Sequence, residues 1–181
     1  MKNRMVLLII TILAFCSAKL EAQVYAYGNF TINVYDVCYA RIFPSGTIRM
    51  NLLASEAGNS MSTKTDASTY MQLTSIAPEG ETRKITAIVS SGSVPAGTQF
   101  QLTAGACSTG AGARGTPSST ITLDRSAQKD VVTGIGSCYT GTSSTSGYNL
   151  IYTWGVDPAS YSQLSATSTV SIMITYTILS I

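Results

Sequence analysis

Few side chains of this sequence are of the types that do chemistry, and histidine is absent among its 181 residues. Without histidine the chain lacks the usual general base, the Ser-His and Cys-His pairs and the commonest zinc ligand. Glu79 and Glu81 flank a turn glycine, and nothing in their spacing selects them as a catalytic carboxylate pair. We therefore predict no catalytic residue, no metal site and no cofactor, and expect a protein that is not an enzyme.

Two short motifs match catalytic or nucleotide-binding patterns in letters only. Gly110–Gly115 reads G-x-G-x-x-G, but Thr116-Pro117-Ser118 and a strand-like run follow where a phosphate-binding loop requires a helix. Ser126–Lys129 reads S-x-x-K, a motif that works on a helix of a much larger enzyme. We interpret the first as a flexible hairpin loop and give neither a function.

The charge distribution separates the first 22 residues from the rest. Three of the eleven basic residues lie there, whereas the remaining chain carries eight basic and eight acidic residues. A neutral remainder has no basic stripe, so we expect no nucleic-acid partner.

Residues 1–22 have the layout of a secretory signal peptide. Lys2 and Arg4 precede the apolar run Met5–Phe15, and small residues follow, with cleavage after Ala22 preferred over cleavage after Ala18. A retained anchor helix and lipidation at Cys16 are the alternatives. We expect export to the cell surface or medium, through the periplasm in a bacterium, and no transmembrane segment after signal removal.

Export makes a disulfide the expected use of cysteine. Signal removal leaves Cys38, Cys107 and Cys138. Cys107 and Cys138 each end a strand-like run before a Gly/Ser/Thr loop, so we favour this pair, with Cys38–Cys138 as the rival.

The mature chain, residues 23–181, is predicted to be one all-β domain. Apolar and polar residues alternate with period two, and Pro/Gly turns separate the runs. The predicted strands are Val24–Val34, Thr47–Leu53, Tyr70–Thr74, Arg83–Ser90, Thr98–Ala106, Thr120–Asp124, Asp130–Thr133, Tyr148–Trp154 and Thr169–Leu179. Ala54–Ser68, Ser108–Ser119 and Thr140–Gly147 are predicted loops. This pattern favours a β-sandwich or a β-barrel.

The two terminal strands resemble those of a known family. The first follows the signal at once and carries Gly28 on its apolar face, and the last, Thr169–Ile178, alternates close to the chain end. With Pro95-Ala96-Gly97-Thr98 and the run Gly147–Tyr152, the chain resembles chaperone–usher-type pilins and the related spore-coat-protein-U-like secreted domains. It departs from many such pilins because its favoured disulfide lies late in the domain.

The resemblance implies an immunoglobulin-like β-sandwich that is incomplete and is completed by a donated strand. The donor face would comprise Val24, Ala26, Gly28, Phe30, Ile32 and Val34, and the receiving groove strand would present Val170, Ile172, Ile174, Tyr176 and Ile178. The expected function is an exported structural or adhesive subunit that self-associates or joins other surface subunits by strand addition, with a periplasmic chaperone as a further partner. Alternatively, Val24–Val34 is an internal strand of a monomeric carbohydrate- or surface-binding module that uses Trp154 and surface tyrosines such as Tyr25, Tyr27 and Tyr35.

Overall fold

The computed structural model describes residues 30–166 and 169–181. The chain divides into two units, 1–34 and 35–181, and the second holds all the strands described below. The predicted signal peptide, Cys16, Val24, Ala26 and Gly28 lie outside the described residues. Among the described residues no helix is long and apolar enough to cross a membrane.

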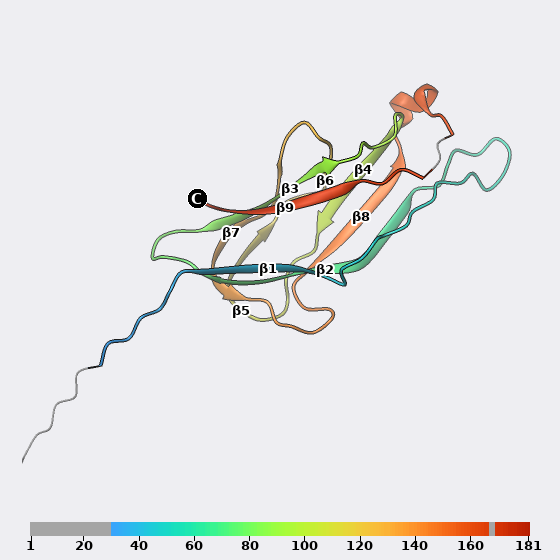
Figure 1. Ribbon diagram of the computed structural model, residues 1–181. Helices are drawn as coiled ribbons and strands as arrows, with labels where there is room; N and C mark the ends of the chain where they lie inside the picture. Colours follow the sequence, from blue (N-terminus) through green and yellow to red (C-terminus); the bar gives the residue numbers. More distant parts are fainter. Residues whose placement is uncertain (1–29, 167–168) are drawn as a thin grey trace, which may run out of the picture. The chain divides into compact units, whose positions relative to one another are not determined.

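The second unit is almost entirely β-structure, which confirms the predicted fold class (Figure 1). Its elements are β1 (Val37–Phe43), β2 (Lys64–Ile76), β3 (Arg83–Ser91), β4 (Thr98–Ala104), β5 (Ala111–Pro117), β6 (Ile121–Thr122), β7 (Lys129–Tyr139), β8 (Tyr148–Val156), the 3-10 helix η1 (Pro158–Gln163) and β9 (Met173–Ser180). The strands form an open antiparallel sheet in the order β6-β4-β8-β2-β7-β3-β9, and β1 adds to β2 and β5 to β7.

The sheet folds over on itself in a sandwich-like manner, so that its inner face encloses the core. Alternate residues of β2, β3, β4, β7 and β8 are buried there, including Met71, Ile85, Leu102, Val132 and Leu150. The hydroxyl groups of Tyr152 on β8 and Tyr176 on β9 lie 2.7 Å apart although these strands are not neighbours in the sheet. Burial of large apolar side chains is the main stabilising contribution to such a core.

One side of this folded sheet is closed by backbone hydrogen bonds. The amide of Leu123 donates to the carbonyl of Phe100 on β4, and the amide of Val89 on β3 donates to the carbonyl of Asp124. The segment that follows β6 therefore joins β4 to β3. The opposite side of the fold, between β1 and β9, has no such connection among the described residues.

Several segments differ from their sequence predictions. The predicted loop Ala54–Ser68 ends within β2, and the predicted strand Thr169–Leu179 begins four residues before β9. Thr47–Leu53 runs beside the start of β2 but makes no ladder of backbone hydrogen bonds with a neighbouring strand, so it is not a strand. The predicted loop Ser108–Ser119 instead contains β5, whose glycines allow close approach to β7. A Cβ at Gly112, which has φ +88°, would lie 2.3 Å from the carbonyl oxygen of Ser137. The glycine motif therefore forms an edge strand and is neither a phosphate loop nor a hairpin loop.

Candidate functional site

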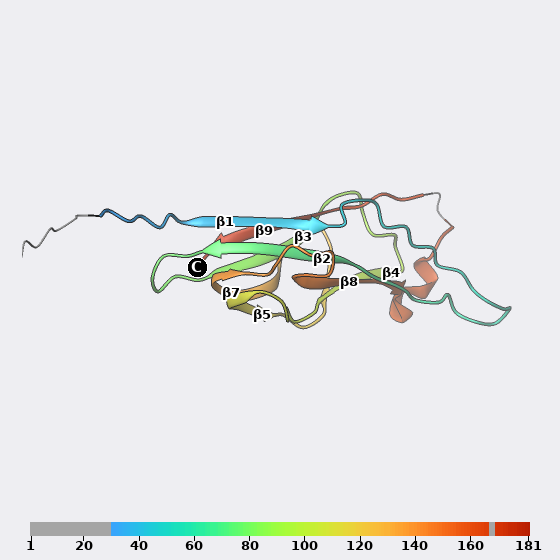
Figure 2. The same cartoon turned by 90° about the horizontal axis from the view of Figure 1, so that it is seen from below.

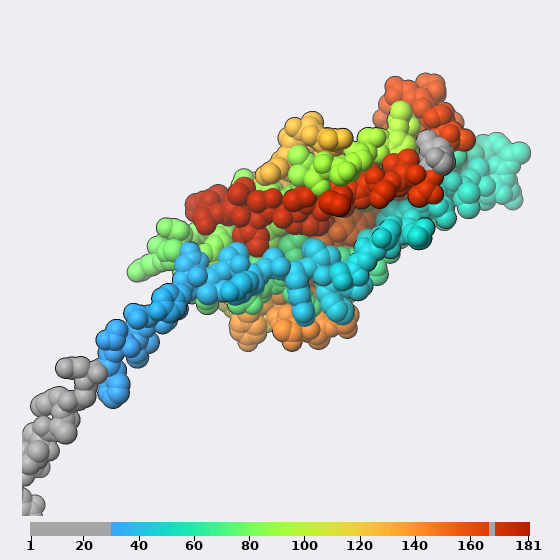
Figure 3. Space-filling model, in the orientation of Figure 1, coloured from blue at the N-terminus to red at the C-terminus, as the bar shows by residue number. Residues whose placement is uncertain are grey.

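The open side of the fold is a seam between the free edges of β1 and β9. Among the described residues, β1 pairs only with β2 and β9 only with β3. β9 runs alongside β1 in two perpendicular views (Figure 2). In the space-filling view atoms of other strands are visible between β1 and β9 over part of their length (Figure 3). Two unpaired strand edges thus face the same seam.

The β9 wall of the seam presents apolar side chains that are only partly covered. Ile174, Tyr176 and Ile178 share the inner face of β9 and pack against the core while remaining half-buried. This is the face that the sequence predicts for the C-terminal groove strand. Val170 and Ile172 precede β9; Val170 is exposed, whereas Ile172 packs against the core.

The β1 wall completes the seam with a second alternating row. Cys38 and Ile42 are half-buried against the core, and Ala40, which lies between them on the same face, is exposed. An inward-facing position that remains exposed indicates that nothing covers this edge. No strand is predicted over β1, although the even-numbered apolar positions of Val24–Val34 resume after Asp36 at Cys38, Ala40 and Ile42.

A buried cation marks the end of the seam where β1 begins and β9 ends. Arg83 on β3 is 4% exposed and pairs in register with Ser180 of β9. Its guanidinium forms an ion pair with Asp36, and it donates to the carbonyl of Val37 at 3.2 Å and to the Ser75 hydroxyl at 2.6 Å. Arg83 therefore fixes the start of β1 against β3 and β2.

Apart from the Arg83–Asp36 ion pair at its end, the seam is lined by two titratable side chains that are held in their neutral forms. Burial raises the pKa of the Tyr176 hydroxyl, and Tyr152 next to it raises it further. Burial also raises the pKa of the Cys38 thiol, against the opposing charge of Arg83. A neutral, apolar seam suits an uncharged peptide strand better than an ionic substrate. No group of three His, Cys, Asp or Glu residues in the described ranges could hold a metal ion.

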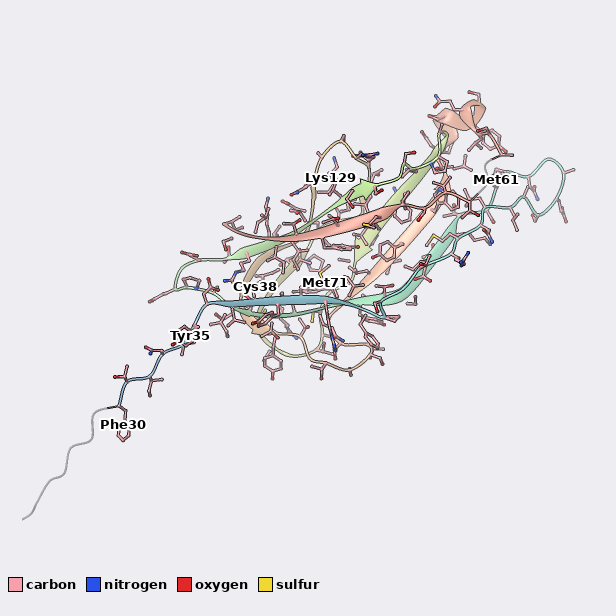
Figure 4. The ribbon with its side chains drawn as sticks, in the orientation of Figure 1. Phe30, Tyr35, Cys38, Met61, Met71 and Lys129 are labelled. Atoms are coloured by element: carbon pink, nitrogen blue, oxygen red, sulfur yellow. The ribbon has the colours of Figure 1, made fainter. Side chains whose placement is uncertain are left out.

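The described part of the predicted donor segment is extended chain with exposed side chains. Phe30, Ile32 and Val34 belong to no strand and are 88%, 85% and 79% exposed (Figure 4). Among the described residues the first strand is β1, and whether Val24–Val34 is donated or internal stays a prediction.

The structure shows Cys38, Cys107 and Cys138 as free thiols, so the Cys107–Cys138 disulfide is absent from it and stays a prediction for the oxidised, exported protein. Cys138 and Cys38 are both register partners of Ser75, on opposite sides of β2. Two strand spacings separate their Cα atoms by about 9–10 Å, beyond the roughly 7 Å that a disulfide spans. The rival Cys38–Cys138 pair therefore does not fit this fold.

Of the predicted surface aromatics, Tyr25 and Tyr27 lie outside the described residues, and Tyr35 is exposed. Trp154 on β8 lies between Lys64 and Phe100 in the sheet register and packs against the core. Tyr39 and Tyr139, by contrast, are exposed and lie in one row on either side of Thr74.

No protein-family model matches the chain, and no curated protein or solved structure is similar enough to count as a match. The resemblance to pilins therefore stays an expectation based on the residues.

Proposed function

We propose that the protein is an exported, non-enzymatic structural or adhesive subunit that assembles at the cell surface by strand exchange. One subunit would donate Val24–Val34, and the seam of the next would receive it between β1 and β9. The observation that carries the proposal is the pair of unpaired edges on one seam, since each edge offers backbone groups to an added strand.

The dimensions of the two parts support this pairing. The predicted donor has eleven residues, and β9 has eight, which correspond to about 36 Å and 26 Å of extended strand. Alternate donor residues would face the half-buried row of β9, while main-chain hydrogen bonds would form to both edges. The donor therefore has the length and the periodicity that the seam requires.

An open apolar seam is an aggregation hazard until it is filled. A periplasmic chaperone that temporarily adds a strand is accordingly the expected partner before assembly. After assembly, other subunits of the same surface structure take that place.

Deletion of residues 23–34 tests the proposal. The truncated chain should keep its β-type circular dichroism but fail to assemble in size-exclusion chromatography, because all the strands of the fold lie within residues 37–180. A synthetic Val24–Val34 peptide should then bind and raise its melting temperature, whereas the same peptide with Ile32→Asp should not. Loss of the β signal with no soluble monomer, even with a chaperone or the peptide present, would contradict the proposal.

The exposed aromatic residues favour a second candidate function, a surface- or carbohydrate-binding module. Tyr39 and Tyr139 are 72% and 55% exposed, and the Arg41 guanidinium lies 5.7 Å from the centre of the Phe43 ring on the same face. Exposed rings beside polar groups suit sugar rings as well as proteins. Glycan-array binding that Tyr39→Ala and Tyr139→Ala abolish, in a chain that remains monomeric, would support this alternative.

A further inference from the structure

We infer that a hollow between residues 49–53 and the first residues of β2 is a binding site for a sugar acid, a ligand that carries one carboxylate and several hydroxyl groups. The hollow has a volume of about 320 Å³, which lies near the lower limit for small-molecule pockets. It lies beyond the end of β1, so the inference does not depend on strand exchange in the seam.

The course of the chain after β1 leaves this hollow open along one edge of β2. β8 pairs with the beginning of β2, whereas β1 covers the other edge only from Tyr70 onward. Residues 49–53 run beside the uncovered part and are anchored at two points. Met50 packs against the core, and the Leu53 carbonyl accepts from the amide and the hydroxyl of Ser62 at 3.1 and 3.2 Å. These contacts hold the segment in place without closing the gap to β2.

Two cations line the hollow, and neither takes part in an ion pair among the described residues. Arg49 comes from the segment after β1, and Lys64 is the first residue of β2. Asp66 is the single acidic residue of the lining, so the hollow keeps one net positive charge. A ligand with one carboxylate would neutralise this charge and accept charge-assisted hydrogen bonds from both cations.

Asp66 favours hydroxyl groups on the ligand over a second negative charge. Its Oδ1 accepts from the amide and the hydroxyl of Ser68 at 3.1 and 2.8 Å, at the bulge where the pairing of β2 with β8 shifts. Both bonds use Oδ1, which leaves Oδ2 to accept from ligand hydroxyls. The same carboxylate repels a dianion such as phosphate, so a singly charged ligand with hydroxyl groups fits better than an inorganic anion.

The remaining side chains of the lining suit a sugar ring. The Asn51 amide and the Thr65 hydroxyl can each donate and accept a hydrogen bond. Leu53 is 65% exposed and offers an apolar surface to the C–H groups of a ring. An acidic peptide would present the same carboxylate with few hydroxyl groups, so a sugar acid uses more of the lining.

Saturation-transfer NMR on the mature chain tests this inference, because the method detects weak binding to monomers and assemblies alike. Methyl glucuronide is the probe, and methyl glucoside, which has a hydroxymethyl group in place of the carboxylate, is the neutral control ligand. Arg49→Gln and Lys64→Gln should each weaken glucuronide binding about tenfold or more, since each removes a hydrogen bond between charged groups. Arg125→Gln changes an exposed arginine outside the hollow and should leave binding unchanged.

Asp66→Asn tests the part of the inference that concerns selectivity. The asparagine keeps an oxygen that can hold Ser68 but lacks the charge, so phosphate should bind more tightly and the preference for glucuronide over phosphate should fall. Failure of the glucuronide to bind, or binding no tighter than that of the glucoside, would overturn the inference. An acidic peptide that binds more tightly than the glucuronide through Arg49 and Lys64 would also overturn it. None of these outcomes bears on strand exchange, because the predicted donor supplies no residue of the hollow.

Discussion

Substitution of Ile32 by aspartate should separate the assembled state from the folded subunit. Ile32 is 85% exposed and makes no strand pairing in the free chain, so Ile32→Asp should change the free energy of unfolding of the monomer by no more than about 0.5 kcal/mol. In the filled seam the same side chain would be buried. Burial of an isoleucine contributes roughly 1.5–3 kcal/mol, and an unpaired buried carboxylate adds a further cost.

These energies set the size of the expected effect. Every 1.4 kcal/mol changes a binding constant about tenfold, so subunit association should weaken by at least about 10-fold to 100-fold. Analytical ultracentrifugation over a concentration series measures this association, and thermal circular dichroism measures the stability of the monomer. Thr31→Asp introduces the same charge one residue away, on the opposite face of an extended segment, and should weaken association much less.

The reasoning would be refuted if Ile32→Asp lowered the melting temperature of the isolated subunit by several degrees while Thr31→Asp did not. That result would place Ile32 in the subunit's own core. Equal effects of the two substitutions on association would also refute it, because the response would then follow charge and not the alternation of the strand.

Three further predictions concern the folded unit. Under an oxidising thiol–disulfide buffer, non-reducing peptide mapping should find Cys107 joined to Cys138, with Cys38 free. Cys107→Ser should then lower the free energy of unfolding of the oxidised protein by roughly 2–5 kcal/mol. Free thiols at both Cys107 and Cys138 in the exported protein would contradict the pairing. Asp36→Asn should destabilise the unit by roughly 1.5–3 kcal/mol because it leaves the Arg83 cation without its carboxylate, whereas Glu56→Gln at an exposed loop should be nearly neutral in the same urea titration. Burial raises the pKa of Tyr176 above the ordinary value of 10.0, so the stability that its neutral form contributes is complete below pH 10. This stability is lost as the pH rises above 10, by at most about 1.4 kcal/mol per pH unit. Tyr176→Phe should flatten this alkaline decline, whereas Tyr161→Phe at an exposed position should leave it unchanged.

The sequence predicts those strands whose alternation reflects one buried face. Arg83–Ser90 nearly coincides with β3, and the even-numbered residues predicted for the last strand include the three that line the inner face of β9. For these two strands the local periodicity is enough to predict the strand and its buried face, since a half-buried strand requires apolar residues at every second position.

Other parts of the fold depend on information that local periodicity does not contain. β5 consists of small residues because β7 approaches its backbone closely, and such a composition also predicts a loop. Thr47–Leu53 alternates but finds no partner strand. The Arg83–Asp36 ion pair joins residues 47 positions apart, and no sequence pattern connects them. The missing pairing between β1 and β9 is a property of the whole topology, so only the structure could reveal the seam.

The most direct test of the proposed strand exchange is amide hydrogen exchange, measured by mass spectrometry on the assembled protein and on the isolated subunit. The account predicts that assembly protects three segments together: Phe30–Val34, the outer edge of β1 and the outer edge of β9. Protection of Phe30–Val34 that is absent from the subunit and present in the assembly would identify it as the added strand. An assembly in which Phe30–Val34 exchanges as fast as in the monomer, while the edges of β1 and β9 remain unprotected, would contradict the account.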